Sequence, residues 1–160
     1  LYNAAMPTKL VRREMFDSIR FLNEGKYDDI TTTYRYFANA KIVAAHGLPR
    51  YCFYRHSGNN SSAATKHHLL NPVQLNEYLA AFRERTEYIS KILPQLGGLA
   101  LYSEWSYMIS MVEKIHRYGL NNCADLLELM CDNLRAHWDD FYNGKYILEF
   151  EKVWMDRYVK

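Results

Sequence analysis

Apolar residues recur every three to four positions along most of the chain, which is the spacing of one face of an α-helix. This pattern predicts a first helix over residues 8–24 and a second over about residues 28–45, with a turn at Gly25. So short a connection predicts an antiparallel hairpin. We expect the first helix to bury Val11, Met15, Ile19 and Leu22. We expect the second to bury Ile30, Tyr34, Phe37, Ala38 and Ile42.

The second half of the chain has the same period with clear stop and start residues. Asn71 and Pro72 are typical of the cap and first position of a helix, which should run to Leu93. Further helices are expected over about residues 99–117, 122–141 and 145–158, with Gly119 as a C-terminal cap and Gly144 as a break. The predicted core is Trp105, Leu126, Leu127, Met130, Leu134 and Trp138.

The same apolar spacing predicts which residues face outward or inward on two of these helices. On the long helix we expect a solvated charged face, made of Glu77, Arg83, Glu84, Arg85 and Glu87. On the last helix we expect an inward aromatic stripe, made of Ile147, Phe150, Trp154 and Tyr158.

Together these elements predict an all-α fold of about six helices in antiparallel hairpins, as a bundle or a helical array. We expect a single domain over residues 1–160, with an N-terminal hairpin at 1–46, an irregular basic loop at 47–71 and four helices at 72–160. The chain does not begin with Met and its helical pattern runs to Lys160, so we interpret it as an excised or trimmed part of a longer chain.

Composition indicates the class of protein and its cellular compartment more than its function. The chain has 160 residues, enough to bury a sizeable core, and 49% of them are hydrophobic. No apolar run approaches the roughly 20 residues of a membrane span, so we expect no membrane partner. Three cysteines do not make an even disulfide framework, which favours a reducing compartment and an intracellular location, cytoplasmic or nuclear.

Charge is distributed unevenly along the chain. Residues 31–76, which we call the acid-free segment, carry five basic and no acidic side chains and four of the six histidines. Residues 121–160 carry five basic and eight acidic side chains, a net charge of −3. Such asymmetry shapes the encounter with charged partners. The acid-free segment is therefore expected to meet either an external anion or the acidic block of residues 121–160, in the same molecule or in a neighbouring copy.

The acid-free segment combines cations with aromatic rings, a combination that is typical of binding to single strands and unpaired RNA bases. The candidate anion-binding residues are Arg35, Lys41, Arg50, Tyr51, Tyr54, Arg55, His56, Lys66, His67 and His68. The sequence pI of about 8.4 is below the value above 9 that is usual for a dedicated nucleic-acid binder.

Two stretches resemble parts of known families. The stretch LNEGKYDDITTTYRYFANA resembles the turn and second helix of a tetratricopeptide hairpin, and YNGKYILE at residues 142–149 repeats its Gly-Lys-Tyr turn. The two glycines, Gly25 and Gly144, are not separated by a whole number of repeats of about 34 residues. We therefore interpret the two turns as belonging to two separate helical hairpins.

The second resemblance concerns catalysis. Arg50 and His56 have the Arg-x(4–6)-His spacing of the all-helical HEPN ribonucleases, which implies an arginine that holds a phosphate and a histidine that moves a proton. Pro49 makes a helix that begins before Arg50 unfavourable. We expect no catalytic activity, with a HEPN-like ribonuclease as the third and weakest hypothesis.

Four potential zinc ligands, Cys52, His56, His67 and His68, lie close in the sequence. Structural zinc sites usually take their ligands in close pairs, and adjacent histidines rarely turn to one ion. We therefore expect no metal and no cofactor.

The sequence thus predicts a non-catalytic helical binding module whose acid-free segment docks an anionic partner, for which we favour nucleic acid. The alternative is a protein-interaction or self-assembly scaffold. In that case a homo-oligomer joins the acid-free segment of one copy to residues 121–160 of the next.

Overall fold

The computed structural model describes residues 4–21, 28–45, 47–48, 51–52, 54 and 70–160. Within these ranges the regular elements are α-helices and short 3-10 turns, and no strand occurs in them. The all-α prediction is therefore confirmed for the described part of the chain. The chain divides into two compact units, Leu1–Ser62 and Ala63–Lys160, and each is described by itself.

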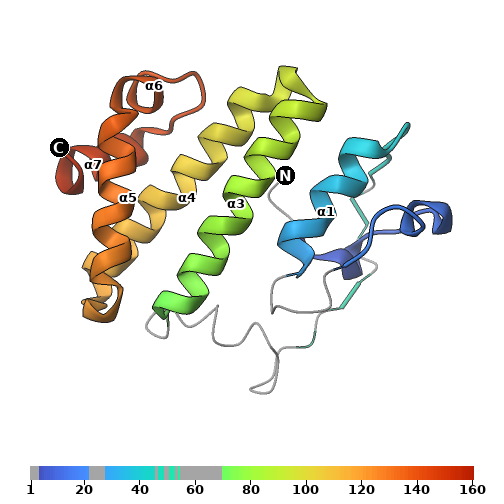
Figure 1. The fold of residues 1–160 in the computed structure, drawn as a ribbon, viewed down its shortest axis with the longest axis horizontal. Helices are drawn as coiled ribbons and strands as arrows, with labels where there is room; N and C mark the ends of the chain where they lie inside the picture. Colours follow the sequence, from blue (N-terminus) through green and yellow to red (C-terminus); the bar gives the residue numbers. More distant parts are fainter. Residues whose placement is uncertain (1–3, 22–27, 46, 49–50, 53, 55–69) are drawn as a thin grey trace. The chain divides into compact units, whose positions relative to one another are not determined.

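Among the described residues of the first unit, the α-helix is α1, which spans Asp28–Asn39 (Figure 1). The helix predicted over residues 8–24 is wrong for the described residues, because only the 3-10 turns Met6–Thr8 and Arg13–Phe16 form there. Side chains of α1 instead donate hydrogen bonds to backbone carbonyl oxygens of this stretch. The Tyr36 hydroxyl donates to the carbonyl oxygen of Ile19 over 2.9 Å, and the Thr33 hydroxyl donates to that of Ala4.

The buried face of α1 differs from the predicted one. Tyr34 is buried as expected, but Phe37 is 40% exposed. The helix ends at Asn39, so Ile42 lies beyond it and is 87% exposed. Tyr36 is buried instead, because its ring packs against the ring of Phe16 at a centroid distance of 5.0 Å. Burial also raises the pKa of the Tyr36 hydroxyl.

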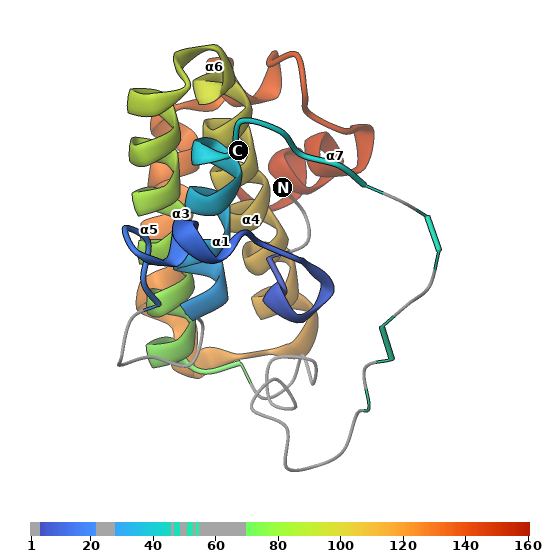
Figure 2. The ribbon, with the colours of Figure 1, turned by 90° about the vertical axis from the view of Figure 1, so that its right-hand side faces the viewer.

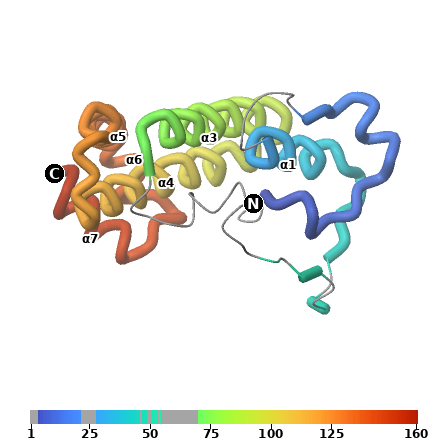
Figure 3. The backbone as a smooth tube through the Cα atoms, turned by 90° about the horizontal axis from the view of Figure 1, so that it is seen from below, coloured from blue at the N-terminus to red at the C-terminus, as the bar shows by residue number. Residues whose placement is uncertain are grey.

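The second unit contains the long antiparallel helices α3 (Pro72–Ile92) and α4 (Gly97–Tyr118), followed by α5 (Ala124–Ala136), α6 (Trp138–Tyr142) and α7 (Glu149–Tyr158). Helix α4 is central, because it packs against α3, α5 and α7. Helix α7 lies on the side of α4 away from α3 (Figures 2 and 3). The core of the unit therefore lies around α4.

Two helix boundaries in this unit match the sequence predictions. The Asn71 side chain accepts a hydrogen bond from the backbone N–H of Gln74 over 2.9 Å, and Pro72 is the first residue of α3. Gly119 ends α4 with φ at 61°, in the left-handed region that favours glycine.

The helix predicted over residues 122–141 is interrupted. Helix α5 ends at Ala136, and a short α6 begins at Trp138 after a turn at His137. Helix α6 ends at Tyr142, and the predicted break at Gly144 follows two residues later. A side chain could not replace the hydrogen of this glycine. A Cβ atom at this position would lie 2.7 Å from the carbonyl oxygen of Asp140.

The predicted core is confirmed in part. Trp105, Met130 and Leu134 are buried, while Leu126, Leu127 and Trp138 are partly buried against the same cluster. The fully buried members that complete it include Leu75, Ile109, Val112, Phe141, Met155 and Val159.

Arg85, predicted on the solvated face of α3, is buried instead. Its guanidinium Nη2 donates to the Ser103 hydroxyl over 2.8 Å, and its Cζ lies 4.3 Å from the centroid of the Phe82 ring. A long side chain that stacks and donates in this way is easily accommodated at a helix contact.

Among the described residues, no helix has the length and apolar character needed to cross a membrane.

Candidate anion-binding segment

The acid-free segment begins inside α1 and reaches the first turn of α3. Of its predicted binding residues, Arg35, Lys41, Tyr51 and Tyr54 are described by the structure. The others lie outside the described residues: Arg50, Arg55, His56, Lys66, His67 and His68. The spatial grouping of the ten residues therefore stays a prediction.

Helix α1 separates the acidic and basic ends of this region. Asp28 and Asp29 occupy its first turn, where carboxylates interact favourably with the helix dipole. Burial raises the pKa of Asp29 and lowers that of Lys9, and the two charges attract each other. Lys41 lies beyond the other end of α1, which is about 17 Å away along a helix of this length. The nearest acids along the chain are thus held away from the exposed lysine.

Arg35 is held by contacts within its own helix. Its Nε donates to the carbonyl oxygen of Thr31 over 3.2 Å, and its Cζ lies 5.5 Å from the centroid of the Tyr34 ring. The side chain is half-buried. Its charge contributes to the local potential, but an anion would have to compete with these contacts.

The chain that follows α1 presents its side chains to solvent. Lys41 is exposed, and so are the flanking apolar residues Ile42 and Val43. Tyr51 is 49% exposed and Tyr54 is 78% exposed. Aromatic side chains are the kind of group on which successive bases of a single strand stack.

The other candidate chemistries, metal binding and catalysis, depend mostly on residues that the structure does not describe. Cys52 is an exposed free thiol. The described residues contain no group of three or more His, Cys, Asp or Glu side chains placed to hold a metal ion. Both members of the HEPN-like pair, Arg50 and His56, lie outside the described residues. His137, which the sequence places beside a helix stripe, is exposed with its ring 5.3 Å from that of Trp105.

Sequence reasoning missed a buried polar cluster in the second unit. Glu151, on α7, is 2% exposed. It accepts hydrogen bonds from the Ser106 hydroxyl at 2.5 Å, the Tyr102 hydroxyl at 3.2 Å and the backbone N–H of Leu148 at 2.8 Å. All three partners lie within the second unit, so this cluster fixes α7 on α4. A Glu three residues after a helix start is a known capping pattern, but nothing in the sequence indicates its two hydroxyl partners.

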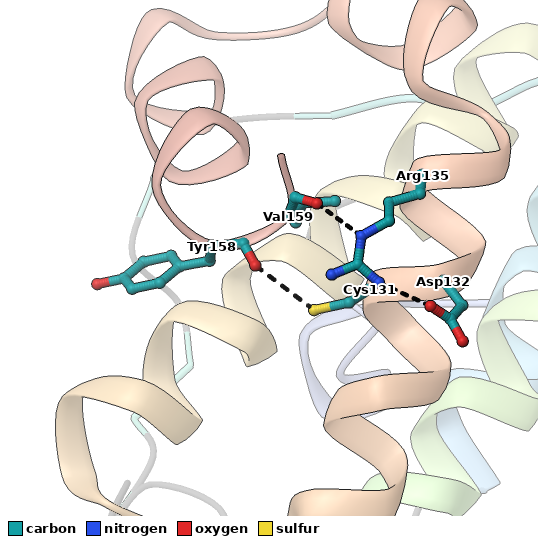
Figure 4. A network of polar contacts seen from close by, with 5 residues as sticks. All are labelled: Cys131, Asp132, Arg135, Tyr158 and Val159. Atoms are coloured by element: carbon teal, nitrogen blue, oxygen red, sulfur yellow. Dashed lines mark hydrogen bonds and ion pairs between the residues drawn. The ribbon is translucent and has the colours of Figure 1, made fainter.

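A second missed network holds the C-terminal end of α7 (Figure 4). Arg135, on α5, donates through Nε to the carbonyl oxygen of Val159 over 2.7 Å and through Nη1 to the carboxylate of Asp132. The Cys131 thiol lies 3.9 Å from the carbonyl oxygen of Tyr158. A guanidinium at the last carbonyls of a helix satisfies acceptors that the helix leaves open.

These two clusters help to determine which side chains of α7 are buried and which are exposed. The predicted inward stripe on α7 is confirmed in part, because Ile147, Trp154 and Tyr158 are partly buried against the core cluster. Glu151, Met155 and Val159 are buried, whereas Phe150 is 50% exposed. The three hydrogen bonds to Glu151 explain the difference, since they require that residue to face α4.

Comparisons of the chain with protein-family models, curated proteins and solved structures find no match.

Proposed function

We propose that the protein is a non-catalytic α-helical binding module whose acid-free segment docks single-stranded nucleic acid, with RNA as the favoured partner. The observation that carries this proposal is the charge of residues 31–76, which have five cations and no acid. Such a segment releases counterions when it meets a phosphate backbone, and this release supplies affinity without sequence readout.

The exposed tyrosines add a second kind of contact. Tyr51 and Tyr54 lie in the same segment as the cations and are exposed. Stacking of a base on an aromatic ring tolerates any sequence, because every base has a π-face. Charge with stacking therefore favours a partner whose bases are unpaired.

The test is the binding of a labelled, unstructured RNA measured by fluorescence anisotropy over a range of salt concentrations. Each neutralisation among Arg50, Arg55 and Lys66 should remove about 0.7 from the log–log salt slope if a single strand is bound. Lys145→Gln, an exposed lysine outside the segment, is the matched control and should leave the slope unchanged.

Stacking is tested separately from charge. Replacing Tyr51 or Tyr54 by Ala should cost about 1–3 kcal/mol of binding free energy if a base stacks there. Tyr118→Ala, which removes an exposed tyrosine near the end of α4, is the matched control. Cleavage of the labelled RNA that disappears in His56→Ala would instead support the ribonuclease hypothesis.

Protein assembly is the second candidate function, favoured by the opposite charges of residues 31–76 and 121–160. It predicts that the same charge substitutions weaken self-association while RNA affinity stays negligible. For the compartment we propose an intracellular one, supported by three free cysteines, of which Cys52 is exposed.

A further inference from the structure

Helix α7 exposes apolar side chains on the face that points away from α4. Phe150 is 50% exposed and Val153 is 60% exposed, and Leu148, just before the helix, is 47% exposed. Trp154 is half-buried at the edge of this face, where it also packs against the core, and its ring lies 4.9 Å from that of Phe150 in an edge-on contact. We call Phe150, Val153 and Trp154 the apolar patch of α7. A surface helix normally places polar residues at such positions.

The orientation of α7 is fixed at both ends. Glu151 in its first turn accepts hydrogen bonds from Ser106 and from the Leu148 backbone. Arg135 donates to the Val159 carbonyl at the other end. Met155 is fully buried between these two anchors. Rotating the helix to bury its apolar patch would break all of these contacts, so the patch stays available to a partner.

Opposite charges flank the apolar patch along the helix. The Glu149 side chain is 91% exposed before the patch, and Arg157 is exposed after it. The eight-residue separation corresponds to about 12 Å along the axis. Glu149 contacts Lys152 of its own helix at 3.4 Å, but an exposed pair of this kind contributes little. Lys152 and the exposed Asp156 also lie on α7, and the Asp156 carboxylate accepts a hydrogen bond from the Tyr142 hydroxyl over 2.8 Å. The two outer charges, Glu149 and Arg157, are complementary to those of a second α7 that runs the opposite way.

We propose that a second copy of this chain docks on the outward face of α7, with the two α7 helices antiparallel and a two-fold axis passing near Val153. In this arrangement Glu149 of each copy meets Arg157 of the other, and the two Val153 side chains face each other. Phe150 and Trp154 pack on either side of the axis. Such an isologous contact closes after two copies.

The dimer should be weak. Helix α7 has 10 residues and spans about 15 Å, so the paired faces bury less than the roughly 1,600 Å² of a standard interface. Contacts below that size are typical of transient complexes, and we expect a Kd on the order of 1 µM to 1 mM. This inference is independent of nucleic-acid binding, and it differs from a head-to-tail contact through the acid-free segment, which would produce rings or filaments.

Sedimentation equilibrium across that concentration range tests the proposal. The mass should rise from that of one chain to that of two and then stop. Val153→Glu should remove the rise, whereas Leu129→Glu, which changes an exposed apolar residue on α5, should not. A mass that stays at one chain up to about 1 mM would overturn the proposal, as would a mass that grows past two chains.

Charge reversal tests the order of the flanking charges. Glu149→Arg and Arg157→Glu should each raise the Kd by about tenfold or more, because the two-fold axis repeats each like-charge contact. The double variant should restore the original Kd, since both contacts are then reversed together. A double variant that dimerises more weakly than either single variant would contradict the antiparallel pairing.

Disulfide trapping tests the position of the two-fold axis without relying on affinity. Cys52→Ser removes the exposed thiol, and Cys123 and Cys131 are buried, which raises their pKa values and keeps them unreactive. In this background, Val153→Cys should give a covalent dimer under mild oxidation. Leu129→Cys is the control and should remain largely monomeric. Equal trapping at both positions, or none at position 153, would place the contact elsewhere and overturn the proposal.

Discussion

Replacing Glu151 by Ala should destabilise the second unit strongly, although Glu151 is a charged residue on a surface helix. The residue is 2% exposed, and its carboxylate accepts hydrogen bonds from the Ser106 hydroxyl, the Tyr102 hydroxyl and the Leu148 N–H. The substitution leaves these three donors without their acceptor. An unsatisfied buried donor costs about 1–3 kcal/mol, and water admitted by the shorter side chain offsets part of this cost. We therefore expect a loss on the order of 3–5 kcal/mol in the free energy of unfolding.

The assay follows from where the tryptophans lie. All three of them, Trp105, Trp138 and Trp154, belong to the second unit, so tryptophan fluorescence during urea unfolding reports on that unit alone. Glu128→Ala, an exposed glutamate on α5, is the control and should change stability by less than about 0.5 kcal/mol.

A double-mutant cycle distinguishes the hydrogen bonds from general burial. Ser106→Ala removes the donor of the shortest bond, at 2.5 Å, and should couple to Glu151→Ala by about 0.5–3 kcal/mol. The reasoning is refuted if Glu151→Ala costs less than about 0.5 kcal/mol, the range of ordinary surface changes. It is also refuted if the two substitutions are additive, because the hydroxyl and the carboxylate would then stabilise the unit independently.

Two further predictions concern the core and a helix start, and both are read by the same fluorescence unfolding. Leu134 is fully buried, so Leu134→Ala should lower the free energy of unfolding by about 2–5 kcal/mol, and Leu127→Ala, at a half-buried position, should lower it clearly less. Equal losses would contradict the observed burial. Asn71→Ala should lower the free energy of unfolding by about 1 kcal/mol, because the N–H of Gln74 loses its acceptor. Asn71→Asp should retain most of the stability. No change in stability in Asn71→Ala would show that this cap is not formed.

Helix boundaries with a local chemical cause were predictable from the sequence. Asn71 and Pro72 begin α3, and Gly119 ends α4, because capping and a left-handed conformation depend on the residue types themselves. The stretch before α1 was not predictable in this way. Its apolar spacing fits a helix, but its backbone carbonyls at Ala4 and Ile19 bind side chains of Thr33 and Tyr36.

Helix faces were predictable only where apolar residues alone decide them. On α7 the polar Glu151 is buried beside Met155, and Phe150 faces outward, so hydrophobicity alone assigns only part of the buried face correctly. Arg85 on α3 is buried for a similar reason, since its partners Ser103 and Phe82 are specific to the folded state. For the candidate site, the sequence predicts the chemistry from charge and residue type. The exposure of Tyr51 and Tyr54 comes from the structure.

The affinity of the protein for a labelled single-stranded RNA at low salt, measured at about pH 7.5 and about pH 6, tests the proposed function most directly. The acid-free segment has four histidines, three of which, His56, His67 and His68, are candidate binding residues. Histidines gain charge as the pH falls through about 6.5, so the segment becomes more basic. We expect binding at both pH values and tighter binding at the lower one. RNA affinity that is undetectable at both would contradict nucleic-acid binding.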